Sequence, residues 1–169
     1  MKASRHLALA LLALAIATGI YLSFERPGPP ELLPAVGYTL LDGQVASTTQ
    51  WSGKVTLVNF WATTCAVCIK EMPRIIETHE RFKARGFETL AVAMSYDPPA
   101  SVVHYAQSRQ LPFGVAIDNT GAIARSFGEI KGTPTTLLVD KRGRIVRRFV
   151  GEPDFAQLHG LIEQLIAEG

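Results

Sequence analysis

The 169-residue chain has few potential metal ligands, with two cysteines and four histidines, and it carries no block of lysine and arginine. A structural zinc site needs about four ligands, so a single cysteine pair with no histidine at ligand spacing argues against one. The net charge is +2 and the basic residues are scattered, which argues against nucleic acid as a partner. The chain has no repeat of 20–50 residues and no low-complexity tract. Its length fits one compact domain with an appendage.

The first 24 residues differ in character from the rest of the chain. A short basic start precedes an uncharged apolar run over residues 7–24. As a helix this run would be roughly 27 Å long, close to the ~30 Å hydrocarbon core of a bilayer. Ala15-Ile16-Ala17, with small residues at its first and third positions, offers a signal-peptide cleavage site, but the apolar run continues past it, which favours an uncleaved membrane anchor. In either case the basic end stays in the cytoplasm and the remainder is exported.

Residues 25–34, ERPGPPELLP, contain four prolines. Proline at this density excludes a helix or a central strand, so the segment is interpreted as a stiff spacer. A domain over residues 35–169 is expected to follow it.

Apolar patterns predict the order of elements in that domain. Asp42-Gly43 between two apolar stretches predicts a hairpin. Helices are predicted over about 66–85, 99–109, 121–127 and after an Asp154 cap, and strands over 55–60, 88–94, 115–117, 135–140 and 144–150. Alternating strands and helices are typical of βαβ units, whereas a tight turn joins the last two strands antiparallel. We therefore predict an α/β fold with a mixed central sheet and helices on both faces.

Both cysteines lie in the stretch NFWATTCAVCIKEMP, residues 59–73. Cys65 falls directly after a predicted strand and at the start of a predicted helix, where Thr63 or Thr64 could supply the N-cap. Free N–H groups and the helix dipole at such a position lower the pKa of a thiol from about 8.5 into the range ~3.5–7.5. Cys68 lies one helical turn further on. The spacing predicts a redox pair in which Cys65 attacks a partner disulfide and Cys68 resolves the mixed disulfide.

Other roles for the cysteine pair fit the sequence less well. Attachment of a c-type haem requires histidine after the second cysteine, where this chain has Ile69. A structural bridge across one turn closes too small a loop to stabilise much, although export to an oxidising compartment keeps that role open. A thiol peroxidase would carry threonine at the position of Ala62. Two thiolates can hold Cu(I), so a Cu(I)-binding metallochaperone for oxidase assembly stands as the alternative function.

The cysteine stretch resembles the active site of the thioredoxin superfamily, and most closely its membrane-anchored TlpA/ResA/CcmG-like branch. The family pattern F-W-A-x-x-C-x-x-C, between a strand and a helix, matches residues 59–68, and the K-E-x-P that follows matches residues 70–73. Gly132-Thr133-Pro134-Thr135 is similar to the proline loop of the family. The resemblance covers residues 35–169. It implies a thioredoxin-like fold with an added N-terminal β-hairpin and an inserted helix at about 97–112.

The resemblance also implies roles for individual residues. Cys65 and Cys68 would be catalytic, and Pro134 would be cis, placing a backbone edge beside Cys65 where a client peptide can pair. The substrate-binding positions it implies in these two motifs are Trp61, Thr64, Thr133 and Pro134. No metal or cofactor is implied.

Glu71 matches an acid that the anchored branch carries after its second cysteine. A partly desolvated carboxyl would have a raised pKa and could exchange a proton with Cys68, which lies three residues earlier on the same helix face. Glu71 could equally be a solvated residue of the first helical turn. Asn59 stands where thioredoxin itself has a buried Asp.

Two departures from the family pattern concern the reduction potential. Thr64 replaces the usual Trp before the first cysteine, and Ala66-Val67 lacks the common proline before the second. We expect both to tune the potential of the pair.

The implied function is that of a membrane-anchored extracytoplasmic thiol–disulfide oxidoreductase. Its clients would be specific protein disulfides, such as those of apocytochrome c or copper-site subunits, and a membrane thiol transporter would donate the electrons. We expect a single-pass protein of a bacterial inner membrane, held in the bilayer by residues 1–24, with the catalytic domain in the periplasm or another extracytoplasmic space.

Overall fold

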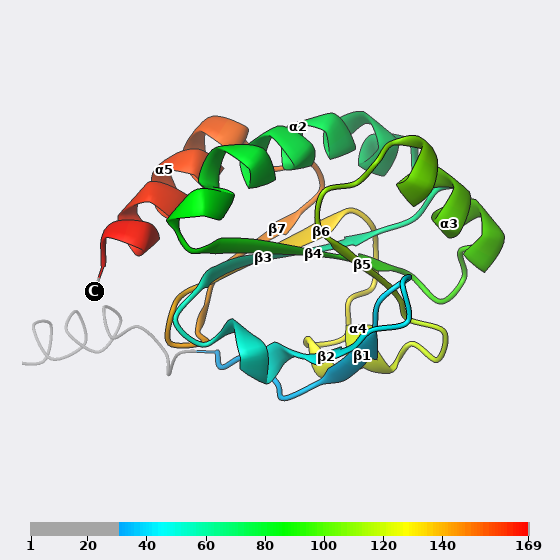
Figure 1. The fold of residues 1–169 in the computed structure, drawn as a ribbon, viewed down its shortest axis with the longest axis horizontal. Coiled ribbons are helices and arrows are strands. Elements are labelled where there is room, and N and C mark those ends of the chain that lie inside the picture. The colour runs from blue at the N-terminus through cyan, green and yellow to red at the C-terminus, as the bar shows by residue number, and fades with distance from the viewer. Residues whose placement is uncertain (1–30, 169) are drawn as a thin grey trace, which may run out of the picture. The chain divides into compact units, whose positions relative to one another are not determined.

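A five-stranded sheet in the order β5-β4-β3-β6-β7 lies at the centre of the structure (Figure 1). The computed structural model describes residues 31–168. Strands β3, β4 and β5 run parallel, whereas β6 is antiparallel to both β3 and β7. The mixed sheet predicted from the sequence is therefore confirmed. The strands are β3 (Val55–Trp61), β4 (Phe87–Ala93), β5 (Gly114–Ile117), β6 (Thr135–Val139) and β7 (Ile145–Val150).

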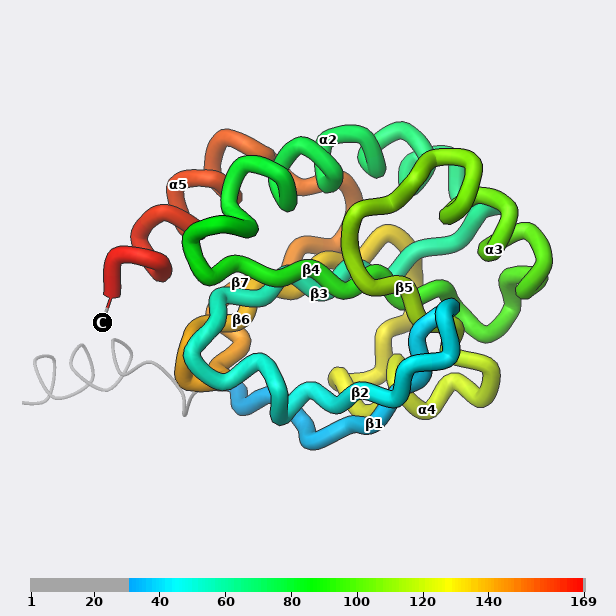
Figure 2. The backbone as a smooth tube through the Cα atoms, in the orientation of Figure 1, coloured from blue at the N-terminus to red at the C-terminus, as the bar shows by residue number. Residues whose placement is uncertain are grey.

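Helices cover both faces of the sheet, as predicted. One face carries α2 (Ala66–Phe82), α3 (Pro99–Ser108) and α5 (Phe155–Ala167). The opposite face carries α4 (Ala122–Ser126) together with the antiparallel hairpin of β1 (Gly37–Thr39) and β2 (Val45–Ser47) (Figure 2). Two 3₁₀ turns, Thr48–Trp51 and Lys83–Arg85, complete the elements. The element order matches the prediction, and most boundaries agree within one or two residues.

Strand β3 is buried along its whole length because layers cover it on both sides. Successive side chains of a strand point to opposite faces. Leu57 and Trp61 accordingly pack with α2 and α5, while Val58 and Phe60 pack with the hairpin and α4. This two-sided burial explains why the strand is a continuous apolar run rather than an alternating one.

The last helix begins where the sequence predicted it. The Asp154 carboxylate accepts hydrogen bonds from the backbone N–H groups of Ala156 and Gln157, which satisfies two free donors of the first turn. The apolar stripe of α5 then packs into the same core cluster as the buried side chains of α2, and its four most buried side chains are Phe155, Leu158, Ile162 and Leu165.

Residues 31–34, which the sequence analysis assigned to the spacer, form hydrogen bonds to the domain that follows. Leu33 N–H donates to the Gly143 carbonyl at 2.8 Å, and the Thr48 hydroxyl donates to the Pro34 carbonyl at 2.7 Å. Residues 31–34 are therefore fixed to the domain although their composition is that of a spacer. The predicted anchor and the rest of the spacer lie outside the described residues. Within residues 31–168, no helix combines the length and apolar character needed to cross a bilayer.

Replacing Leu158 with Ala is expected to lower the free energy of unfolding by about 2–5 kcal/mol, because its fully buried side chain would leave a cavity between α5 and the sheet. Chemical unfolding of the full chain measures the loss. The neighbouring Gln157→Ala, at an exposed position, should change stability by no more than about 0.5 kcal/mol. Equal effects of the two changes would contradict the packing described for α5.

Candidate redox site

The cysteine motif and the proline loop leave the sheet at the same end. Strand β3 ends at Trp61, whose partner in β4 is Ala93, and Phe60 pairs with Thr135 at the start of β6. Because β6 runs antiparallel to β3, Pro134 lies beside the point where the chain leaves β3. Segments some 70 residues apart in the sequence, at 62–68 and 132–135, are thereby brought together.

Cys65 itself is the N-cap of α2. Its backbone is extended, and its Sγ accepts a hydrogen bond from the Cys68 N–H at 3.2 Å. The prediction that Thr63 or Thr64 supplies the cap is wrong. Thr63 instead donates both its N–H and its hydroxyl to the Asp97 carboxylate, at 2.6 Å each, and the sulfur takes the position that a hydroxyl would otherwise occupy.

The two sulfurs form a disulfide, with their Cα atoms 5.2 Å apart. Cys65 is partly exposed, whereas Cys68 is 0% exposed. Only Cys65 can therefore be reached by a second protein. In the reduced form, the Cys68 N–H and the positive end of the α2 dipole would stabilise a thiolate at Cys65. This arrangement fits a nucleophilic cysteine followed by a resolving one.

Glu71 is buried beneath the pair, with 0% of its surface exposed. The Asn59 side-chain amide on β3 donates to Glu71 Oε1 at 3.0 Å and to the Thr136 hydroxyl on β6 at 3.0 Å. Glu71 Oε2 is also buried and makes no hydrogen bond to another described residue. The sequence allowed Glu71 to be either a desolvated acid or a solvated residue of the first helical turn. The first interpretation is confirmed, because this side of α2 faces the sheet and Glu71 is buried.

Burial raises the pKa of Glu71 from its ordinary 4.5 to about 7. The hydrogen bond from Asn59 opposes this rise, and the negative charge of Glu152 adds to it. A carboxyl that titrates near neutral pH is present in both protonation states there, so it can accept a proton and return it. Cys68 lies one turn earlier on the same face of α2. The site therefore pairs a buried thiol with a buried acid.

The predicted substrate-binding residues divide into surface and core positions. The Thr133–Pro134 peptide bond is cis, as expected. Thr64 is exposed and Thr133 is partly exposed, so both can be reached from outside, whereas Pro134 is buried. Trp61 is fully buried and packs against Tyr105 of α3, with ring centroids 5.2 Å apart. The prediction that Trp61 contacts substrate is therefore wrong in this structure; it supports the site from below.

Two site residues escaped the sequence analysis. Asp97 holds Thr63, as described above, and the Tyr96 hydroxyl lies 3.1 Å from the Thr133 hydroxyl. Both precede α3, and Asp97-Pro98-Pro99 looks in sequence like an ordinary helix start. No local pattern connects them to partners 34 and 37 positions away.

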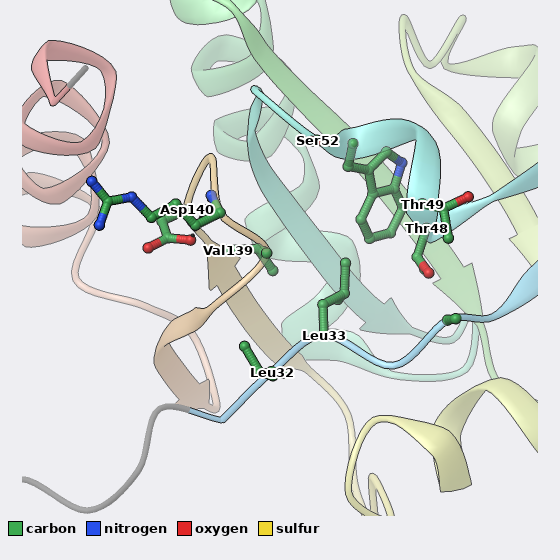
Figure 3. A pocket seen from close by; sticks show the side chains of 11 residues that line it. Leu32, Leu33, Thr48, Thr49, Ser52, Val139 and Asp140 are labelled. Carbon is green, nitrogen blue, oxygen red and sulfur yellow. Dashed lines mark hydrogen bonds between the residues drawn. The ribbon is translucent and has the colours of Figure 1, made fainter.

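A cavity of about 250 Å³ lies at the opposite end of the sheet (Figure 3). Leu33, Val139 and Asp140 are among its lining residues. Val139 pairs with Thr56, and five further residues of β3 at ~3.3 Å each place the cavity roughly 16 Å from the end of the strand that leads to Cys65. The Asp140 carboxylate is already bound by Arg144 at 2.6 Å. This cavity takes no part in the redox site.

Comparisons with known proteins point in the same direction as the geometry. The family model described as Redoxin matches residues 30–162. The chain is 30% identical over 147 residues to a protein of Bacillus thuringiensis subsp. konkukian named thiol-disulfide oxidoreductase ResA, covering 87% of this chain and 84% of that protein. A protein of the same name from Bacillus cereus is 32% identical over 127 residues, covering 75% and 72% of the two chains.

Solved structures share the fold. The solution structure of a candidate thioredoxin from Neisseria meningitidis superposes with a TM-score of 0.77 at 38% identity, over 83% of this chain and 93% of that one. The crystal structure of a thioredoxin-family thiol:disulfide interchange protein from Chlorobium tepidum has a TM-score of 0.76 at 24% identity, over 84% and 100% of the chains. The second likeness supports the fold alone.

Replacing Glu71 with Gln is expected to remove a pH-dependent loss of stability. The pKa of this acid is higher in the folded than in the unfolded chain, so its stabilising contribution is full below pH 4.5 and is lost as the pH rises through 7. The unfolding free energy of Glu71→Gln relative to wild type should therefore rise by roughly 2–3 kcal/mol between pH 5 and pH 8.

The measurement is chemical unfolding of the full chain in its disulfide form, in which the cysteines do not titrate. Glu168→Gln, an exposed acidic position directly after α5, is the control and should show no such trend. A difference between Glu71→Gln and wild type that stays constant with pH would contradict the raised pKa.

Proposed function

Because the chain belongs to the Redoxin family and is a TlpA/ResA/CcmG-like thiol–disulfide oxidoreductase of the thioredoxin superfamily, we propose that it reduces specific protein disulfides outside the cytoplasm. The disulfides that we propose as substrates are those formed by the haem-binding cysteines of apocytochrome c or by the copper-site cysteines of oxidase subunits. The observation that carries it is the placement of Glu71, a buried acid with a pKa of about 7, one helical turn after the buried Cys68.

The reaction begins with the reduced protein. The Cys65 thiolate attacks one sulfur of the client disulfide, a mixed disulfide forms, and the other client sulfur leaves as a thiolate that takes a proton from water. Cys68 then gives its proton to Glu71 and attacks the Cys65 sulfur, so that the second client sulfur leaves. Two electrons pass to the client, and the protein is left with the Cys65–Cys68 disulfide of this structure.

Glu71 serves the second step in this scheme. Cys68 is shielded from water, so its proton needs an acceptor inside the protein. At neutral pH a substantial fraction of Glu71 is ionised and can accept that proton. Asn59 keeps the carboxyl in place through its hydrogen bond to Oε1. The chain thus replaces the buried acid that thioredoxin carries on its strand with one on the helix.

The proposed location rests on the sequence of residues 1–24. Their basic start and long apolar run support a single membrane anchor, with the catalytic domain in the periplasm or another extracytoplasmic space. A domain that donates electrons there must be reduced again after each turnover. We assign this step to a membrane thiol transporter that carries reducing equivalents from the cytoplasm.

Replacing Cys68 with Ala should trap the client, because the mixed disulfide at Cys65 can no longer be resolved. In cells that make c-type cytochromes, we expect a covalent adduct between the full chain and apocytochrome c, or a copper-site subunit, that reductant dissolves. Non-reducing electrophoresis followed by mass spectrometry of the linked peptides identifies the client and its cysteine. The adduct should be found in the membrane fraction.

The control is Cys65→Ala/Cys68→Ala, which should give no adduct at all. Two results together would contradict the reductase proposal and support the metallochaperone. The first is that Cys68→Ala forms no adduct through Cys65, and the second is that the reduced wild type binds one Cu(I) per chain through both thiols. An adduct found only with cytoplasmic proteins would contradict the proposed location.

A further inference from the structure

The loop between β4 and α3 touches both halves of the redox site. Two adjacent residues of this loop do so: Asp97 binds the segment that leads to Cys65, and Tyr96 contacts the proline loop. The segment and the proline loop come from distant parts of the chain. Through these contacts the loop before α3 connects the segment that leads to Cys65 with the proline loop.

Asp97 anchors the loop. Its carboxylate is only 2% exposed, and its two oxygens accept separate hydrogen bonds from the N–H and the hydroxyl of Thr63, at 2.6 Å each. The Asp97 N–H in turn donates to the Met94 carbonyl at 3.0 Å, which closes a tight turn after β4. These three hydrogen bonds hold the backbone at this turn firmly.

Tyr96 projects from that anchored turn into solvent. Its side chain is 59% exposed, yet its hydroxyl is held 3.1 Å from the Thr133 hydroxyl, next to Pro134. An exposed aromatic ring that is already held in one place loses little conformational entropy when a partner packs against it. Tyrosine is also among the residues that most often dominate binding energy at interfaces.

Tyr96 belongs to a group of exposed apolar side chains at this end of the sheet, which we call the apolar rim: Val67, Tyr96 and Val150. Val67 lies between the cysteines, and Val150 is the register partner of Thr135, directly after Pro134. Of the six large apolar side chains that are exposed in residues 31–168, these three border the redox site. Gathering of this kind marks a contact surface rather than scattered exposure.

We propose that Tyr96 is a specificity-determining residue that selects client polypeptides with an apolar residue beside the attacked cysteine. The ring of Tyr96 provides the apolar contact, the Thr133 hydroxyl holds the ring, and Asp97 fixes the backbone that carries it. The inference rests on the proposed reduction of protein disulfides. It adds a preference in client sequence and assigns that preference to one side chain outside the cysteine and proline motifs.

Two synthetic disulfide peptides test this role, identical except that the residues flanking the attacked cysteine are Phe in one and Ser in the other. The reduced full chain in lipid nanodiscs should reduce the Phe peptide about tenfold faster than the Ser peptide, measured as the second-order rate constant of a single turnover, in line with the discrimination that an apolar contact provides. In Tyr96→Ala the preference should fall to about twofold or less. In Tyr96→Phe, which keeps the ring, it should stay within about threefold of wild type.

The matched control is Val146→Ala, an exposed apolar position on β7 outside the apolar rim, which should keep the full preference. If Tyr96 had only a structural role, Tyr96→Ala would lower the rates of reduction of both peptides equally and leave their ratio unchanged. That result would overturn the inference. A ratio lost as completely in Tyr96→Phe as in Tyr96→Ala would also overturn it, since the hydroxyl and not the ring would then decide. A wild type that reduces neither peptide contradicts the proposed function itself.

Discussion

The hydrogen bond from the Cys68 amide to the Cys65 sulfur joins the chemistry of this protein to its fold. It makes a sulfur the N-cap of α2, so the helix begins at the reactive atom and directs its free N–H groups toward it. The same contact places the second cysteine one turn inside the helix, where the core shields it. Exposure of the first sulfur and burial of the second, on which directional thiol–disulfide exchange depends, both follow from this single geometry.

Two buried carboxyl groups support the pair in different ways. Both oxygens of Asp97 are bonded to Thr63, so this side chain holds the backbone shape ahead of Cys65. Glu71 has one oxygen bonded to Asn59 and one without a partner among the described residues, and burial brings its pKa to about 7. A fully bonded acid serves as a structural anchor, whereas an under-bonded one in a low dielectric is suited to move a proton.

Prediction from the sequence succeeded where the signal is local and failed where it depends on which layer covers a residue. The helix period placed Cys68 and Glu71 on one face of α2, but it could not say that this face lies against the sheet, so the state of Glu71 was left open. Trp61 was assigned to substrate contact from its motif position, and the packing of α3 over β3 buries it instead. Thr63 was a reasonable prediction for the N-cap, but its hydroxyl donates to Asp97, which lies 34 residues away in the sequence.

The sequence by itself determined the order of helices and strands, the mixed sheet, the cysteine pair at a helix start and the proline loop, because periodicity, turn residues and short motifs act over a few positions. Tertiary structure alone decided the identity of the cap, the burial and pKa of Glu71, and the contacts of Tyr96 and Asp97 with the two halves of the site. These properties arise from pairing and packing between segments that are distant in the chain, and such contacts leave no local pattern to read.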